Sequence, residues 1–186
     1  MMNTSILMAV WVVLSTGCAA TTSFVSAKDP NFHGMLTELF VVSQVGSEGE
    51  ISGDLFKTEL ERTAQGCGIR VGVTNMSKLE LDPGIHLRRF KSFGSKYLLT
   101  LAATGGTKND GTIVVSTYDA RLYDASDQIV WRADVRLSLG GTIREDRGST
   151  ELARGLLIKL NTDGVTRWCA SLVEPVTESD RGQPRR

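Results

Sequence analysis

The sequence predicts a two-layer domain of the α+β or α/β class, in which two main helices cover one face of a mixed, mostly antiparallel sheet. Two segments carry apolar residues at helical spacing, and the first of them lies between two short apolar runs. Three strand patterns then follow in quick succession between residues 97 and 139. The expected element order is β-α-β-β-β-β-α.

The first half of the domain has the pattern of a β-α-β unit. The apolar run 39–45 predicts a strand, and Ile69–Val73 predicts a second strand, parallel to the first if the helix crosses over between them. Ser47 and Glu50 form a weak capping box before the helix, and Gly66 ends it. The apolar face of this helix consists of Ile51, Leu55, Phe56, Leu60 and Ala64.

The three later strand patterns are joined as consecutive hairpins. The first strand covers Tyr97–Thr104, the loop Gly105–Gly111 follows, and the second strand continues to Tyr123. In the third, two sets of residues alternate strictly, which predicts one dry and one wet face. The dry set is Ile129, Trp131, Ala133, Val135, Leu137 and Leu139, and the wet set is Val130, Arg132, Asp134, Arg136 and Ser138. We therefore expect Trp131 to be a core aromatic residue.

Two further helices complete the pattern. A short helix over Pro83–Phe90 fits the stretch before the hairpins. The last helix starts with Ser149 or Thr150 as its N-cap and allows a continuation, with a break near Asp163, as far as Leu172. Its apolar face consists of Leu152, Leu156, Leu157 and Leu160.

The N-terminal segment has the pattern of a secretion leader. The apolar run Ile6–Leu14 is shorter than the roughly 20 residues that a membrane-spanning helix needs, and the small residues 15–17 follow it. Gly17-Cys18-Ala19 resembles the lipobox of bacterial lipoproteins, in which a small residue precedes an invariant cysteine. The resemblance implies that residues 1–17 are removed and that Cys18 carries a covalent lipid. A plain signal peptide, cut for instance after Ala20, is the alternative.

The same resemblance implies a location and a domain organisation. Ala19, rather than Asp, follows the cysteine, which in enterobacterial lipoproteins implies delivery to the outer membrane, facing the periplasm. We expect residues 18–36 to be the lipidated cysteine and a tether of small and polar residues, and 37–173 to be one domain. The polar segment 174–186 is expected to be a disordered tail.

Cys67 and Cys169 are the two cysteines that remain. Both are expected near the C-terminal ends of helices, and an oxidising periplasm permits a disulfide between them. Two buried free thiols are the alternative.

Three short stretches resemble small accessory lipoproteins of the bacterial envelope. They are 96–101, Tyr118–Ala125 and Ile129–Arg132, where a strand with an Asp-Ala turn leads into a Val-Trp-Arg strand. The resemblance implies a non-catalytic accessory role in envelope assembly or transport, with an envelope protein or complex as partner. A regulator or enzyme acting on cell-wall material is the alternative function.

Composition and motifs argue against other classes of function. The chain has 21 basic and 21 acidic residues and no polybasic stripe, so no nucleic-acid partner is expected. His33 and His86 are its two histidines and belong to no zinc-ligand motif. Serine-hydrolase spacings are also missing. We therefore expect no enzyme activity, no metal and no cofactor other than the lipid on Cys18.

The wet face of the last hairpin is the best candidate for a binding surface. Arg121, Arg132, Asp134 and Arg136 fall on this face, where Asp119 and Arg121 can form cross-strand ion pairs with the next strand. A merely solvated charged face is the alternative, because exposed ion pairs contribute only about 0 to 1 kcal/mol each.

Overall fold

The protein forms one six-stranded mixed sheet with three helices, in a computed structural model that describes residues 20–47, 51–77, 82, 84–110, 112–140, 145–167 and 169. The elements are β1 (Thr21–Lys28), β2 (Glu38–Ser43), α1 (Gly53–Gly66), β3 (Arg70–Asn75), α2 (Gly84–Phe93), β4 (Leu98–Asn109), β5 (Thr112–Tyr123), β6 (Ile129–Ser138) and α3 (Glu145–Thr162). The predicted α+β class is thereby confirmed.

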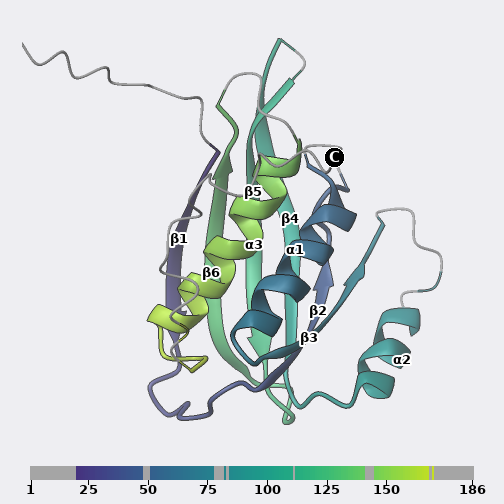
Figure 1. The fold of residues 1–186 in the computed structure, drawn as a ribbon, viewed down its shortest axis with the longest axis vertical. Coiled ribbons are helices and arrows are strands. Elements are labelled where there is room, and N and C mark those ends of the chain that lie inside the picture. The colour runs from purple at the N-terminus through teal and green to yellow at the C-terminus, as the bar shows by residue number, and fades with distance from the viewer. Residues whose placement is uncertain are drawn as a thin grey trace, which may run out of the picture.

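The strand order is β1-β6-β5-β4-β2-β3. β2 is parallel to β3, as the β-α-β pattern predicted. β2 is also parallel to β4, which was not predicted, and the other three pairs are antiparallel. Figure 1 shows α1 and α3 side by side over one face of the sheet, with β1 and β3 at its two edges. The sheet therefore has one face that two helices cover and another that they leave free.

The core lies between the sheet and the pair α1 and α3. Alternate residues of β6 from Trp131 to Leu137 are buried against the helices, and Trp131 is 1% exposed. The predicted alternation is wrong at the start of the strand, where Ile129 is exposed and Val130 is buried. The helices contribute mainly Phe56, Leu60, Ala64, Leu152, Leu156, Leu157 and Leu160. Full burial of a large apolar side chain contributes about 1.5–3 kcal/mol, so this layer is the main source of stability. The predicted core position of Trp131 is confirmed.

α1 starts later than its predicted capping box. Its N-cap is Ser52, whose side-chain oxygen accepts a hydrogen bond from the Leu55 N–H at 3.2 Å, so the assignment to Ser47 is wrong. A cap must sit next to the first helical turn, and the chain first passes through a turn at 45–47. The helix ends as predicted, with Gly68 at a φ of +69° that favours glycine.

β1 is the largest difference from the sequence prediction. Residues 21–28 pair with β6 along eight positions, so the expected tether over 18–36 is wrong for this stretch. Thr21, Thr22, Phe24 and Val25 are residue types that favour strands. Phe24 points under α3, where Gly155 lets the backbone approach: a Cβ there would lie 2.5 Å from the Thr22 hydroxyl oxygen. The folded domain thus begins well before residue 37.

The β4–β5 hairpin is longer than predicted. Gly105–Gly111 was expected to be a loop, but β4 continues to Asn109 and β5 begins at Thr112. The register shifts between Ala103 and Gly105, and a Cβ on Gly106 would lie 2.4 Å from the Val115 carbonyl oxygen. The glycines here permit close packing of two strands that extend past the core as a ribbon. Because the ribbon consists mainly of glycine and polar residues, its sequence pattern resembled that of a loop.

The last helix also differs at both ends. α3 begins at Glu145, so Ser149 is not its N-cap; this residue is buried and donates a hydrogen bond from its hydroxyl to the Ser52 carbonyl at 3.0 Å. The helix ends at Thr162, and Gly164, at a φ of +67°, turns the chain so that Thr166 forms a parallel bridge with Leu36. No helix continues through the residues described after it, and Leu172 lies outside them.

α2 lies on the face opposite α1 and α3. It covers Gly84–Phe93, close to the predicted 83–90, and Pro83 lies outside the described residues. Phe40 of β2 anchors it, with ring centroids 5.8 Å from Phe90 and 5.5 Å from Phe93. α2 covers only the β2–β3 end of this face, and the β1–β6–β5 end carries no helix among the described residues.

A disulfide joins Cys67, directly after α1, to Cys169, which follows α3 by seven residues. The two cysteines are 102 residues apart in sequence. The predicted pair is therefore present, and it links the ends of the two helices that cover the core.

We expect removal of this disulfide to destabilise the fold strongly. In the chain-entropy model, a loop of about 100 residues restricts the unfolded chain by up to about 4.7 kcal/mol, and strain reduces this value. The double variant Cys67→Ser/Cys169→Ser should melt about 10 °C below the parent in thermal unfolding by circular dichroism. Reductant should lower the parent's midpoint and leave the double variant unchanged. An equal response of both proteins would contradict the prediction.

Candidate interaction face

The candidate site is the helix-free face of β5 and β6, which we call the Arg–Asp face and define by Asp119, Arg121, Arg132, Asp134 and Arg136. Its existence follows from the strand period of two: residues at odd positions of β6 from 131 to 137 are buried, and the residues between them point the other way. In the β5–β6 register, Asp119 lies opposite Asp134, and Arg121 lies opposite Arg132. Like charges are thus direct neighbours, and opposite charges meet diagonally.

Asp119 resolves this conflict by binding two arginines at once. Its Oδ2 accepts a hydrogen bond from the Arg121 Nε at 2.7 Å, and its Oδ1 accepts one from the Arg132 Nε at 3.0 Å. The Asp119 side chain is 12% exposed, while those of Arg121 and Arg132 are 41% and 54% exposed. The predicted cross-strand pairing is confirmed for Asp119 and Arg132. One covered carboxylate therefore holds two half-exposed guanidinium groups in a fixed position.

The pKa of Asp119 reflects these contacts. Burial alone would raise it, but the hydrogen bonds from Arg121 and Arg132, together with their charges, lower the pKa below its ordinary value. The carboxylate thus stays ionised at neutral pH. Arg121 holds Asp119 through both Nε and Nη2 and also forms a hydrogen bond with Tyr123, whereas Arg132 holds it through Nε.

Asp134 and Arg136 complete the face, and their charges are held by fewer contacts than that of Asp119. The Asp134 side chain is 73% exposed, and its carboxylate is 3.7 Å from the Arg132 Nη2. Arg136 lies opposite Thr117 of β5 and Ser23 of β1, and no described carboxylate forms an ion pair with it. The face therefore holds three cations against two anions. Its four residues predicted from sequence lie together on one surface.

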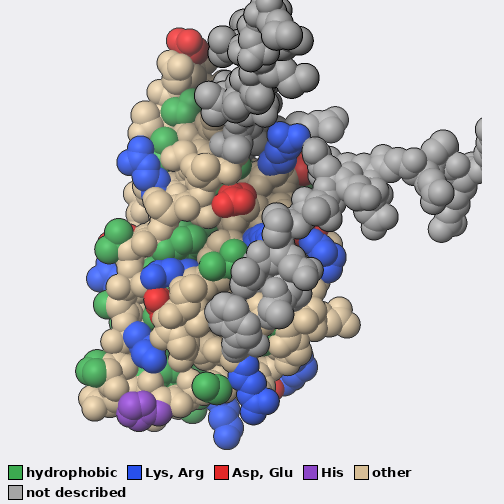
Figure 2. Space-filling model, turned by 60° about the vertical axis from the view of Figure 1, so that its left-hand side comes forward, with side chains coloured by type: hydrophobic (Ala, Val, Ile, Leu, Met, Phe, Trp, Pro, Cys, Tyr) green, Lys and Arg blue, Asp and Glu red, His purple; other side chains and the backbone are tan. Residues whose placement is uncertain are grey.

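Figure 2, which brings the β1 side of the molecule forward, shows how charges spread over the described surface. Lys and Arg side chains alternate with apolar and uncharged ones, and Asp and Glu are fewer in this view. The cationic groups are thus dispersed over the visible face.

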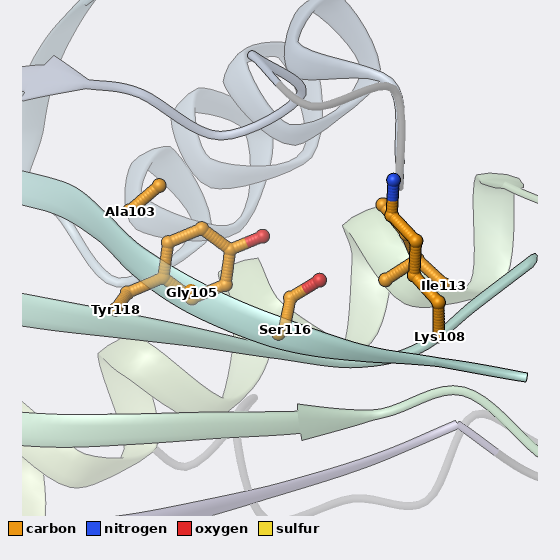
Figure 3. Close-up of a pocket in the computed structure, with 7 residues that line it drawn as sticks. Ala103, Gly105, Lys108, Ile113, Ser116 and Tyr118 are labelled. Carbon is orange, nitrogen blue, oxygen red and sulfur yellow. The ribbon is translucent and has the colours of Figure 1, made fainter.

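A small hollow of about 140 Å³ lies where the β4–β5 ribbon leaves the core. Its lining includes Ala103, Gly105, Lys108, Ser116 and Tyr118, and Figure 3 shows Ser116 and Tyr118 projecting from β5 to the same side as Lys108. The hollow is produced by the glycines and register shifts of the ribbon. Its volume is enough for a few water molecules and one small polar group.

The remaining sequence candidates are placed as follows. His86 is buried in α2, where its Nδ1 lies 3.1 Å from the Thr74 hydroxyl oxygen. Within the described part of the chain, no group of three or more His, Cys, Asp or Glu side chains could hold a metal ion.

None of the described helices is long and apolar enough to cross a membrane. Cys18 lies outside the described residues.

No protein-family model and no curated protein matches this chain. Among solved structures, it is similar to a PelC dodecamer from Paraburkholderia phytofirmans, with a TM-score of 0.51 and 18% sequence identity over 80% of this chain and all of that chain. A variant of the same PelC dodecamer matches with a TM-score of 0.49 and 18% identity over 73% of this chain and 96% of that one. The first likeness shows a shared fold.

We expect Asp119→Asn to destabilise the protein by about 1–3 kcal/mol in urea unfolding at pH 7, because two charge-assisted hydrogen bonds lose their acceptor charge. The lowered pKa means that the carboxylate stabilises the fold above its unfolded pKa of about 3.9 and loses this effect as pH falls through the folded pKa. The difference from the parent should therefore shrink below pH 4.

The matched control is Asp134→Asn, because Asp134 is exposed and lies on the same face. It should change the unfolding free energy by less than about 0.5 kcal/mol. Equal effects of the two substitutions would show that Asp119 does not organise the face.

Proposed function

We propose that the chain is a lipid-anchored, non-catalytic accessory protein of the bacterial envelope, located at the outer membrane and facing the periplasm, where it binds partner proteins and acts as an assembly of several copies. The observation that carries the proposal is the Arg–Asp face, where Asp119 holds two partly exposed arginine side chains in place on a sheet surface that no described helix covers. Such preformed polar groups suit recognition of a protein surface with complementary charge.

Two further findings support the proposal. The Cys67–Cys169 disulfide suits an oxidising compartment. The PelC protein that shares this fold forms a dodecamer, which supports assembly of copies for this chain as well. With Cys18 as lipid attachment site, the anchor is also close to the fold, because β1 begins three residues later and three residues span at most about 11 Å.

The anchor is tested by metabolic labelling with palmitate. The parent should incorporate label, and Cys18→Ser should incorporate none, because the thioether to the lipid cannot form on serine. Retained labelling of the variant would contradict a lipid on Cys18. Fractionation of the labelled parent should then place it with outer-membrane markers.

The binding role is tested by crosslinking in cells with a photoreactive residue in place of Asp134, which is exposed on the Arg–Asp face. We expect a defined crosslinked partner, and Arg136→Glu should reduce its yield at least tenfold, since the charge is reversed without breaking a described ion pair. The control, Lys91→Glu, reverses an exposed charge on α2, also without breaking a described ion pair. An unchanged yield with Arg136→Glu would contradict the proposed role of this face.

A further inference from the structure

The sheet has two edges that no described strand covers, β1 and β3. Unpaired edge strands present rows of backbone donors and acceptors, and proteins either protect them or use them for pairing with another chain. The two edges here differ in shape in a way that makes them complementary.

The β3 edge forms the floor of a groove between two helices. Two adjoining hollows of about 530 and 630 Å³ run along it, and they share Glu61 of α1, Gly72 of β3 and Phe93 of α2 as lining residues. Figure 1 shows α1 over one face of the sheet here and α2 beyond the β3 edge. The groove is therefore open along the edge and has a helix on either side.

The backbone of β3 faces this groove with alternate residues. The N–H groups of Arg70 and Met76 donate to the carbonyls of Thr37 and Ser43. By alternation, those of Val71, Val73 and Asn75 point away from β2. The Val73 N–H donates to the Glu61 carboxylate at 3.3 Å. Glu61 thus occupies the position that the carbonyl of an added strand would take.

The β1 edge is shaped to enter such a groove. The Asp29 N–H donates to the Val130 carbonyl, so by alternation the backbone groups of Thr22, Phe24, Ser26 and Lys28 point away from β6. On the helix-free side, β1 carries the side chains of Thr21, Ser23, Val25 and Ala27, none of them large, and Val25 is 75% exposed. Small side chains there leave room for an overlying helix.

Strand direction fits as well. β1 runs antiparallel to β3 within one chain, since β3 is parallel to β2 and β4, and three antiparallel pairs separate β4 from β1. Two copies related by rotation about an axis along the strands keep these directions, so β1 of one would meet β3 of the other in the antiparallel sense. Both sheets then keep α1 and α3 on the same side.

We propose that β1 of one copy pairs with β3 of the next, in the groove between α1 and α2, so that the sheets of neighbouring copies join edge to edge. This inference rests on the proposed assembly of copies at a membrane. Anchors near the start of every β1 must all reach the same bilayer, which an antiparallel pair of two β1 strands cannot satisfy because it points the two anchors in opposite directions. A head-to-tail β1–β3 contact satisfies it.

Proline substitutions test the pairing, because proline removes one N–H and is tolerated at an edge position whose N–H faces outward. Thr22→Pro blocks the β1 edge and Val71→Pro blocks the β3 edge, with Thr22→Ala and Val71→Ala as matched controls that keep the N–H. The full chains, purified in detergent, are compared by size-exclusion chromatography with light scattering. Circular dichroism melts identify any proline variant that fails to fold.

We expect the parent and both alanine variants to assemble, and each proline variant alone to be a folded monomer. Mixed at equal amounts, the two proline variants should form a dimer that grows no further, since each retains the edge that the other lacks. If only one proline variant loses assembly, or if both assemble as the parent does, the β1–β3 contact is wrong. A monomeric parent would instead overturn the assembly in the proposed function.

Val25→Lys provides a second variant that leaves the backbone unchanged. Val25 is highly exposed in the single chain, so the fold should keep its melting temperature, whereas a charge beneath α2 of the neighbour should abolish assembly. The matched control is Ile129→Lys, which adds the same charge at an exposed position outside the contact. Unimpaired assembly of Val25→Lys would contradict the proposed position of α2 over β1.

Discussion

The Asp163 carboxylate, at the end of α3, is the contact on which the packing of this sheet depends. It accepts hydrogen bonds from the Trp131 indole N–H at 2.7 Å, the Ser26 hydroxyl at 2.7 Å and the Lys159 ammonium at 2.9 Å. Burial would raise its pKa, but these three donors lower it, so the group stays ionised. One charge thereby fixes the helix against β1 and β6 together. The chain can then turn at Gly164 and return toward Cys169 and its disulfide.

That arrangement determines which face of the sheet remains available. With α1 and α3 on one side, β6 must divide its residues between a buried row and a row in water, and Arg132 belongs to the second. α2 covers only the β2–β3 end of this second face because Phe40 is the large aromatic residue on which it packs. At the uncovered end, the charged side chains of β5 and β6 must pair with one another. Asp119 provides this pairing by binding Arg121 and Arg132.

Elements with a strong period could be predicted from the sequence, and those with a weak one could not. From Trp131 onward β6 alternates without a break, so the core position of Trp131 and the shared surface of Arg132 and Arg136 were predictable. The assignment of Ile129 to the buried face and Val130 to the exposed face was wrong, because the register with β5 shifts at that end of the strand. β1 was missed because its polar Ser and Thr residues resemble a tether, and only pairing with β6 gives them a place in the sheet. The contact of Asp163 with Trp131 joins residues 32 apart, which no local pattern indicates.

The misassigned β1 also changes what a lipid on Cys18 would do. A flexible tether over residues 19–36 would let the domain turn freely above the membrane, so no edge of the sheet would have a fixed orientation relative to the bilayer. With β1 starting at Thr21, a lipid on Cys18 would hold one end of one edge strand within about 11 Å of the bilayer surface. Neighbouring copies would then differ mainly by rotation about the membrane normal. Under that restriction, two β1 edges could meet only in the parallel sense, which would place the helices of the two copies on opposite faces of the joined sheet. A β1–β3 contact keeps every anchor on one side and every α1 and α3 on one face.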